Sequence, residues 1–400
     1  MILVGDYAPG PCSVGINISG NLILANLEGP LLPQNHSLIP SSKAGPNLYS
    51  GELPDSSADY IFSLANNHTM DFSQAGLDAT IHTLHKRGIR YCGAGTTIHS
   101  ARNPLVILDG EVSVGIIACC EAQFGVARLK QAGVAEFGPW IYREISSLSE
   151  QVDAVIISIH AGVEDSPWPS PYIRDLYHSF IDAGATIVHG HHAHVPQGYE
   201  QYRDGVIFYG LGNFAVNPSR WQNSPNGLWS LGTEINLNSK PLEWRPMSFE
   251  IRYQVGSEKI CIEESSSEER KRHMQYLEIC NHPLHDEDLF EALWQEVAVR
   301  AYYAYGGHYM GILPSSGSVG CGVKEFPSML KRAVLRRVRS VKTDTRRLLL
   351  YYHVLACESH RQMLTTALGV LSGEITDLRN NETRRIADEM LPWSCEVIKQ

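Results

Sequence analysis

The sequence predicts an α/β fold in which β-strands and α-helices alternate along the chain up to about residue 217. Short apolar runs rich in β-forming residues recur, stretches with apolar residues at helical spacing lie between them, and several apolar runs end in polar side chains. Polar residues at the ends of successive strands are typical of open α/β sheets, because these sheets place their ligand sites where strands give way to loops.

The first quarter of the chain predicts three strands followed by a helix. The strands are expected from apolar runs that each end in polar residues, at residues 2–5, 22–27 and 61–65. Leu77, Ile81 and Leu84 then recur at i, i+4 and i+7, which predicts an amphipathic helix. Gly88 follows them and is expected to end this helix in a left-handed conformation.

The next part of the chain repeats the order strand, helix, strand. An apolar run predicts a strand at residues 152–159, and apolar residues on one face predict a helix at residues 172–183. A further strand is expected at residues 185–188. Residues 228–263 instead alternate apolar and polar positions between Pro and Gly residues, which predicts antiparallel strands that close a second sheet.

After about residue 265 the sequence changes to a run of charged residues followed by helical patterns. This change predicts a first domain at residues 1–264 and a helical C-terminal region at residues 265–400. A Gly/Ser-rich stretch at residues 305–322 is expected to be a linker. Residues 324–361 contain ten Lys or Arg against three Asp or Glu. A basic helix of this kind is expected to lie on an anionic membrane or an acidic partner, or else to pack on the α/β body while its arginines face water.

The composition excludes several classes of protein. A hydrophobic fraction of 43% and a charged fraction of 19% are typical of a folded globular protein. The formal net charge of −10 argues against a nucleic-acid partner, because binding phosphates needs a basic face. No secretory signal is visible at the start, and no apolar run approaches the ~18 residues of a membrane span. The nine cysteines are odd in number and lack a C-x-x-C pair, which favours reduced thiols and a cytoplasmic location.

Four histidines at the end of an apolar run predict a metal site. They lie in the segment IVHGHHAHVPQG, at His189, His191, His192 and His194. Imidazole is a common metal ligand in proteins because the neutral ring can bind a cation. Other polar residues that follow apolar runs are expected to join them at one rim, and these are Asp6, Glu28, Asn66, Asn67, His68 and His160. His189 is expected to be structural, because its place within the predicted strand indicates burial.

The motifs resemble one family when they are taken together and in order. They are GD near the start, NLEGP, LANNHxxDxxxxGL, HxGxE, GAxxVxGHHxHVxQ and YGLGNF, and they cover about residues 1–217. This order resembles the CapA-type bacterial capsule and poly-γ-glutamate synthesis proteins, a branch of the calcineurin-like metallophosphoesterases. The resemblance implies a four-layer α/β/β/α sandwich with a C-terminal helical extension and one or two divalent metal ions, which could be Mn, Fe, Zn or Mg.

The resemblance also implies a role for each motif residue. Asp6 and His194 would hold a first metal, and Glu28 would bridge two metals. Asn67, His160 and His192 would hold the second, and His68 would be the acid that protonates the leaving oxygen. Further residues are implied as outer-sphere groups or alternative ligands, and these are Asn66, Asp71, Glu164, His191 and Asn213.

The chain departs from the family pattern at two places. The usual D-x-H of the first strand is here Asp6-Tyr7-Ala8, so one imidazole is missing. The bridging acid is Glu28 where Asp is usual, and its extra methylene moves the carboxylate. The insertion of one residue in GHHAH leaves His191 and His192 as alternatives for the same ligand position.

Three functions follow as hypotheses. The first is a metal-dependent phosphoester hydrolase acting on a phosphorylated saccharide, a lipid-linked intermediate or a polymer intermediate in the synthesis of a capsule, exopolysaccharide or polyglutamate. The second is a non-catalytic, metal-binding assembly factor for such a polymer. In the third, the main function is contact with a membrane or a synthase through residues 324–361, which implies a peripheral membrane location. Nucleotide-driven and serine-nucleophile mechanisms have little support, because a P-loop, a G-x-S-x-G elbow and a complete G-x-G-x-x-G are absent from the sequence.

Overall fold

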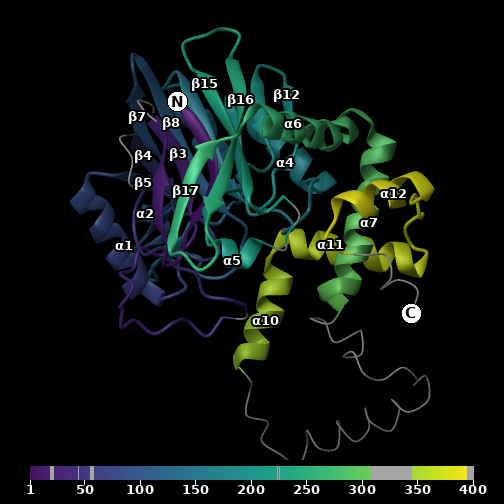
Figure 1. Cartoon of the computed structure of the whole chain (residues 1–400), viewed down its shortest axis with the longest axis horizontal. Helices are drawn as coiled ribbons and strands as arrows, with labels where there is room; N and C mark the ends of the chain where they lie inside the picture. The colour runs from purple at the N-terminus through teal and green to yellow at the C-terminus, as the bar shows by residue number, and fades with distance from the viewer. Residues whose placement is uncertain are drawn as a thin grey trace, which may run out of the picture.

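The computed structural model shows two β-sheets accompanied by helices, with the C-terminal helices gathered at one side (Figure 1). The residues that the structure describes are 1–18, 22–43, 45–54, 58–222, 224, 226–307 and 345–393.

The larger sheet has nine strands and places three motif-bearing strands side by side. β1, β3 and β4 run parallel to one another, and β14 runs parallel to β1 beside the main path of the sheet. The path runs β2-β17-β16-β15-β1-β3-β4-β5. The bounds are β1 (Ile2–Ala8), β2 (Ser13–Ile16), β3 (Leu22–Leu27), β4 (Asp59–Ser63), β5 (Arg90–Cys92), β14 (Asn213–Val216), β15 (Trp229–Asn236), β16 (Glu243–Tyr253) and β17 (Lys259–Glu264).

The antiparallel strands in residues 228–263 join this sheet, so the expectation that they close a second sheet is wrong. β15 pairs with β1 through Ile2↔Glu234 and Leu3↔Thr233. β14 pairs only with the later part of β1, from Asp6 onward. Without β15, the first residues of β1 would expose backbone N–H and C=O groups, and pairing with β15 satisfies these groups.

The smaller sheet has six strands in the order β12-β13-β11-β10-β8-β7. β8, β10, β11 and β13 are parallel, and β10 and β11 confirm the strands expected at residues 152–159 and 185–188. The bounds are β7 (Leu105–Asp109), β8 (Val112–Cys120), β10 (Ala154–His160), β11 (Ile187–His191), β12 (Tyr199–Tyr202) and β13 (Gly205–Phe208). A separate two-stranded ladder joins β6 (Ala94–Gly95) and β9 (Gly133–Val134).

The two faces of the smaller sheet belong to two hydrophobic clusters, which defines the layers. Ile116 and Ala118 of β8 lie in the cluster that holds the core of the larger sheet. The alternate residues Ile117 and Cys119 lie in a second cluster, with α3 (Trp140–Ser149) and α4 (Pro171–Asp182). On the larger sheet, α1 (Ser73–Arg87) and α6 (Ser267–Asn281) add Leu84 and Leu277 to the first cluster. The order helix, sheet, sheet, helix confirms the predicted four-layer fold.

The two helices predicted from apolar spacing are confirmed. α1 ends at Gly88, whose φ of 67° lies in the left-handed region as expected. α4 begins after Ser170, whose side chain accepts a hydrogen bond from the Ile173 N–H. Two short helices complete this part of the chain, α2 (Ile98–Arg102) and α5 (Pro218–Trp221).

The C-terminal helices pack against the α/β body. Leu293, Met363 and Met390 lie in the same hydrophobic cluster as Ile157 of β10 and Phe180 of α4. The helices are η1 (His282–His285), α7 (Glu287–Ala301), the π-helix η2 (Tyr302–Gly306), α10 (Thr345–Ala356), α11 (Glu358–Ser372) and α12 (Asn381–Met390). The boundary near residue 264 falls between β17 and α6, and the division into two domains stays a prediction.

Parts of the C-terminal predictions lie outside the described residues. The expected linker at residues 305–322 is described only to residue 307, and the basic region at residues 324–361 is described only from residue 345. Within the described ranges, no helix combines the length and apolar character needed to cross a bilayer. The seven cysteines in those ranges are free thiols.

Candidate metal centre

The predicted ligands meet at a rim that the two sheets share. In the larger sheet, Asp6 lies opposite Asn26 and Asn213 in the parallel ladders. In the smaller sheet, His160 lies opposite His191. Asp6 lies within β1 instead of at its end, because the strand continues past an irregularity in its pairing with β14. Parallel pairing brings side chains that are distant in sequence to one edge.

The glycine of the GD motif explains how Asp6 reaches this rim. A Cβ at Gly5 would lie 1.8 Å from the Gly212 carbonyl oxygen, so only glycine fits there. The Asp6 N–H donates to the same carbonyl over 2.9 Å. Gly212 belongs to the YGLGNF motif and has a φ of 73°. The first and last motifs therefore contact each other and hold the Asp6 backbone.

Glu28, His192 and His194 form the tightest group of candidate ligands. One donor atom from each lies within 4.8 Å of the others, and all three side chains are buried. His194 Nε2 lies 3.5 Å from Glu28 Oε1. Among the described residues, neither oxygen of the Glu28 carboxylate has a hydrogen-bond partner. A buried carboxylate without partners is costly, and a bound cation would compensate it.

Asp6 forms a second anionic point beside this group. Its Oδ1 accepts from Asn26 Nδ2 over 2.8 Å and lies 3.2 Å from His191 Nδ1. Its Oδ2 lies 3.5 Å from His194 Nδ1 and has no hydrogen-bond partner in the described part of the chain. Burial alone would raise the pKa of Asp6, but the nearby His191 and His194 and the hydrogen bond from Asn26 lower it to about 2.

The pKa values of Glu28 and His194 show how strongly the centre favours a cation. Burial raises the pKa of Glu28 to about 8, against the opposing charge of His194. Burial alone would lower the pKa of His194, but the charges of Glu28 and Asp6 raise it to about 9. A proton thus replaces the missing positive charge in the metal-free protein. Carboxylate oxygens together with imidazoles are a donor set that fits a divalent transition metal or zinc.

Asn67 and His160 form the side of the site nearest β4. Asn67 Oδ1 lies 3.0 Å from His160 Nε2, which lies 3.7 Å from Glu28 Oε1. The other ring nitrogen, His160 Nδ1, lies 3.2 Å from Asn26 Nδ2. Asn26 therefore contacts both Asp6 and His160 and links the two sheets.

His68 points one ring nitrogen at the centre and the other away from it. Its Nε2 lies 3.9 Å from Glu28 Oε1. Its Nδ1 lies 2.8 Å from both Lys43 Nζ and Asp71 Oδ2. Burial, together with the charge of Lys43, lowers the pKa of His68 to about 4. The Asp71 carboxylate also accepts from the Leu48 N–H and pairs with Lys43, so it lies on the far side of His68 from Glu28.

The histidine segment after β11 is bent by two residues with positive φ. His192 has a backbone φ of 90° and His194 a φ of 59°, values that residues other than glycine rarely adopt. Such conformations cluster at functional sites. His191 faces Asp6, whereas His192 and His194 face Glu28, so all three reach the centre. His189 instead contacts the Val4 carbonyl oxygen over 2.8 Å and joins the two sheets, as expected of a structural residue.

The outer-sphere candidates lie around these ligands. Asn213 Oδ1 lies 3.0 Å from His194 Nδ1, which orients Nε2 toward Glu28. Asn66 donates to Asn26 Oδ1 and to the Leu27 carbonyl oxygen, so it supports the turn after β4. Glu164 has a solvent-exposed side chain that lies close to two of the histidines. The surrounding protein atoms act to raise its pKa, but the charges of His192 and His194 lower the pKa of Glu164 to about 2.

Five residues of this region were not predicted from the sequence. Asn26 is the first residue of the NLEGP motif, and its place in that motif was the available signal. The other four are distant from every motif in the chain, and they are Lys43, Glu121, His353 and His360. Only the fold brings them to the centre.

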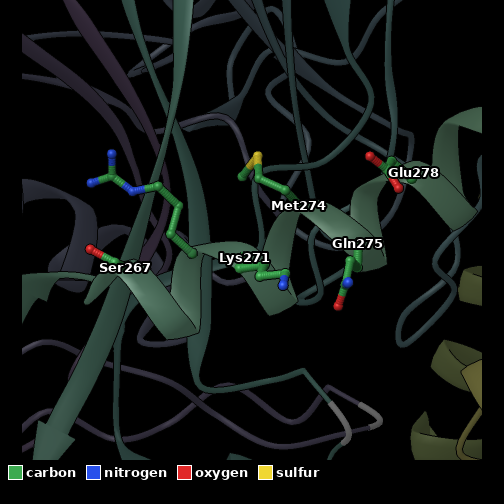
Figure 2. A pocket seen from close by; sticks show the side chains of 6 residues that line it. Ser267, Lys271, Met274, Gln275 and Glu278 are labelled. Carbon is green, nitrogen blue, oxygen red and sulfur yellow. The ribbon is translucent and has the colours of Figure 1, made fainter.

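Two surface cavities lie near the described elements. Figure 2 shows one of about 580 Å³ lined by six residues of α6, and since a single helix forms it, we assign it no role. The other, of about 400 Å³, lies beside His68 and is lined by Lys43, Asp71, Phe124 and Leu349 among others.

Comparisons with known proteins identify a family and several relatives of this chain. Residues 17–218 match the family model described as bacterial capsule synthesis protein PGA_cap. The capsule biosynthesis protein CapA of Bacillus anthracis is 32% identical over 164 residues, which are 39% of this chain and 40% of that protein. The PGA biosynthesis protein CapA of Bacillus subtilis (strain 168) is 33% identical over 162 residues, which are 39% of this chain and 42% of that protein.

The similarity has clear bounds. The matched part of this chain spans less than half the length of these two relatives. The crystal structure of a novel phosphatase from Mycoplasma pneumoniae aligns with 69% of this chain and 97% of that chain, at 11% identity and a TM-score of 0.35. A similarity this weak carries no argument about function. The family match ends at residue 218, so it covers none of the C-terminal helices.

Proposed function

The chain belongs to the bacterial capsule synthesis protein family PGA_cap, and on this basis we propose that it is a metal-dependent phosphoester hydrolase in surface-polymer synthesis. The polymer would be a capsule polysaccharide, an exopolysaccharide or polyglutamate. The substrate would be a phosphorylated saccharide, a lipid-linked intermediate or a polymer intermediate. A cytoplasmic location, with membrane or synthase contact through residues 324–361, is part of the same proposal.

One observation carries the proposal. Glu28 is fully buried, has no hydrogen-bond partner among the described residues, and lies beside two imidazoles in one tight group. Asp6, Asn67 and His160 surround this group. One or two divalent ions held by these six side chains would act as Lewis acids and would lower the pKa of bound water.

His68 is the residue proposed to move a proton. Its low pKa keeps the ring neutral near pH 7, so it carries a single N–H. Its Nδ1 lies 2.8 Å from both a donor, Lys43 Nζ, and an acceptor, Asp71 Oδ2, so these two partners occupy that nitrogen. The other ring nitrogen, Nε2, faces Glu28 and is the one positioned to exchange a proton with a leaving oxygen.

A second candidate is a non-catalytic, metal-binding assembly factor. Ala8 lies two residues after Asp6 on β1, at the position where the family pattern has a histidine. The alanine side chain offers no metal ligand. A centre without this imidazole would bind its first metal more weakly. Such a protein would retain one metal and turn over no phosphoester.

Metal analysis of the purified protein tests the proposal. We expect at least one transition metal per chain, and we expect the double variant His192→Ala/His194→Ala to lose it while circular dichroism shows an intact fold. Absence of metal after incubation with Mn or Zn would contradict the metal centre. A panel of aryl phosphomonoesters and phosphodiesters then separates the two candidates, because only the hydrolase turns them over.

A further inference from the structure

The corner between α10 and α11 is attached to the rim of the centre by a buried carboxylate. Glu121 follows the last residue of β8, and its N–H donates to the His160 carbonyl oxygen over 3.2 Å. Its side chain accepts from the Ser359 N–H over 3.1 Å, from Ser359 Oγ over 2.5 Å and from Cys357 Sγ over 3.0 Å. Glu121 is 0% exposed, so these bonds hold the corner in one position.

This attachment places two histidines beside the centre. The ring of His353 stacks on Phe124, with centroids 4.7 Å apart and planes inclined by 10°. Lys43 Nζ, which contacts His68, lies 5.6 Å from the centroid of the same Phe124 ring. The ring of His360 meets that of His353 edge-on, at 4.5 Å between centroids.

His360 also lies near the proposed metal ligand His192. Its charge lowers the pKa values of His192 and Glu164, which indicates that the ring is close to both side chains. Within the described residues, the Nδ1 atoms of His353 and His360 are buried and have no hydrogen-bond partner. Buried polar atoms are almost always paired, so these two need a partner other than the described residues.

We propose that His353 and His360 form the wall of the substrate pocket and bind phosphoryl oxygens of the phosphoester. The proposal rests on the proposed function and extends it to helices that the family match does not cover. A neutral imidazole N–H is a suitable donor to an anionic oxygen, and such charge-assisted bonds are strong in a buried site. The two residues would thus determine specificity and would not be metal ligands.

Binding of inorganic phosphate to the full-length, metal-loaded protein tests this role. Calorimetry should show that His360→Ala and His353→Ala weaken phosphate binding by roughly 10- to 100-fold each, the loss expected for one hydrogen bond to a charged group. His360→Asn should restore most of the affinity, because the asparagine amide occupies the place of Nδ1. His82→Ala, at an exposed histidine of α1, is the matched control and should bind phosphate as wild type does.

The outcomes separate this inference from the proposed function. Unchanged phosphate affinity in both alanine variants, with metal content equal to wild type, overturns the inference even if the protein hydrolyses phosphoesters. A wild-type protein that does not bind phosphate overturns it as well. Weakened binding in a protein that hydrolyses no phosphoester supports the inference and contradicts the hydrolase. If the alanine variants do not fold, His360→Asn compared with His360→Leu measures the same hydrogen bond.

Discussion

At the scale of single residues, the centre is organised around one carboxylate, Glu28, that has no hydrogen-bond partner among the residues the structure describes. Glu28 lies near His68, His160 and His194, yet no described donor forms a hydrogen bond with it. The neighbouring Asp6 is instead bonded by Asn26. The pKa of Asp6 is about 2, whereas that of Glu28 is raised to about 8. A cation bound between them would stabilise the second negative charge.

Substitution of His68 separates proton transfer from metal binding. His68 contacts Glu28 only at 3.9 Å and is not a proposed ligand, so His68→Ala should keep the metal. Turnover of an aryl phosphoester should fall by roughly 10²–10⁴, the usual contribution of a positioned proton donor. Elemental analysis and steady-state kinetics measure the two effects.

Asn67→Ala is the matched control for this experiment. Its amide oxygen lies 3.0 Å from His160 Nε2, so its loss should lower the metal content of the site next to β4. A His68→Ala protein that hydrolyses substrate as fast as wild type would show that this histidine has no role in proton transfer.

Metal affinity should rise steeply with pH. Burial raises the pKa of Glu28 to about 8, and the charges of Glu28 and Asp6 raise that of His194 to about 9 against the effect of burial, so the pair holds a proton at pH 7 in the metal-free protein. This proton must leave before both groups bind a cation, so Mn or Zn binding should release protons and tighten from pH 6.5 to pH 9. Calorimetry in two buffers of different ionisation enthalpy measures the proton release. Affinity that is constant over this range would argue against these two ligands.

At the scale of elements, the site depends on how one strand and one helix corner end. β11 ends at His191, and the two positive φ values that follow turn His192 and His194 inward. The α10–α11 corner is held by Glu121, whose pKa is raised by burial against the opposing hydrogen bonds from Ser359 and Cys357. Both elements are locally strained or desolvated, and tertiary contacts maintain them.

Removal of the Glu121 carboxylate should release the α10–α11 corner. Glu121→Ala leaves the Ser359 N–H and Oγ without their acceptor, which should cost about 1–3 kcal/mol of unfolding free energy for each buried donor left unsatisfied. Urea denaturation measures the loss, and limited proteolysis should show faster cleavage near residue 357. Glu121→Gln keeps one acceptor oxygen and should be less destabilised. Equal stability of the alanine variant and wild type would exclude an anchoring role.

At the scale of the whole molecule, the C-terminal helices are part of the α/β body in packing terms. Met363 and Leu364 of α11 lie in the hydrophobic cluster of the smaller sheet, and Leu293 of α7 joins them. Truncation near Gly322 would remove α10 to α12 and expose this cluster to water. We therefore expect that such a truncation destabilises the protein, and that it also removes His353 and His360.

Charge reversal tests the basic region more cleanly than truncation. The variant with Arg332, Arg336, Arg337 and Arg339 all changed to Glu should lose co-sedimentation with vesicles that contain anionic lipid. Attraction of this kind contributes about 1 kcal/mol per basic residue, and it is screened beyond a Debye length of about 8–10 Å. Binding by the wild type should therefore weaken as salt increases. A wild-type protein that does not sediment with vesicles at low salt would remove the membrane contact from the proposed function.

The convergence of the proposed ligands was predictable because each of them lies near the end of a periodic apolar run. Strand periodicity identified β1, β3, β4, β10 and β11, and parallel pairing brings their ends together. The two predicted helices were likewise confirmed, because apolar spacing and a terminal glycine are local signals. The sequence by itself therefore determined the fold class and the residues that converge on the centre.

The remaining features needed the tertiary structure because they depend on contacts between distant residues. Glu121 and Ser359 are 238 positions apart, and no periodic pattern connects them. The assignment of β15 to the sheet of β1 likewise depended on which strand edge was left open. The placement of His353 and His360 beside His192 follows from how helices pack. Packing responds to the whole shape of the core, whereas the local pattern of a sequence reports only on each element by itself.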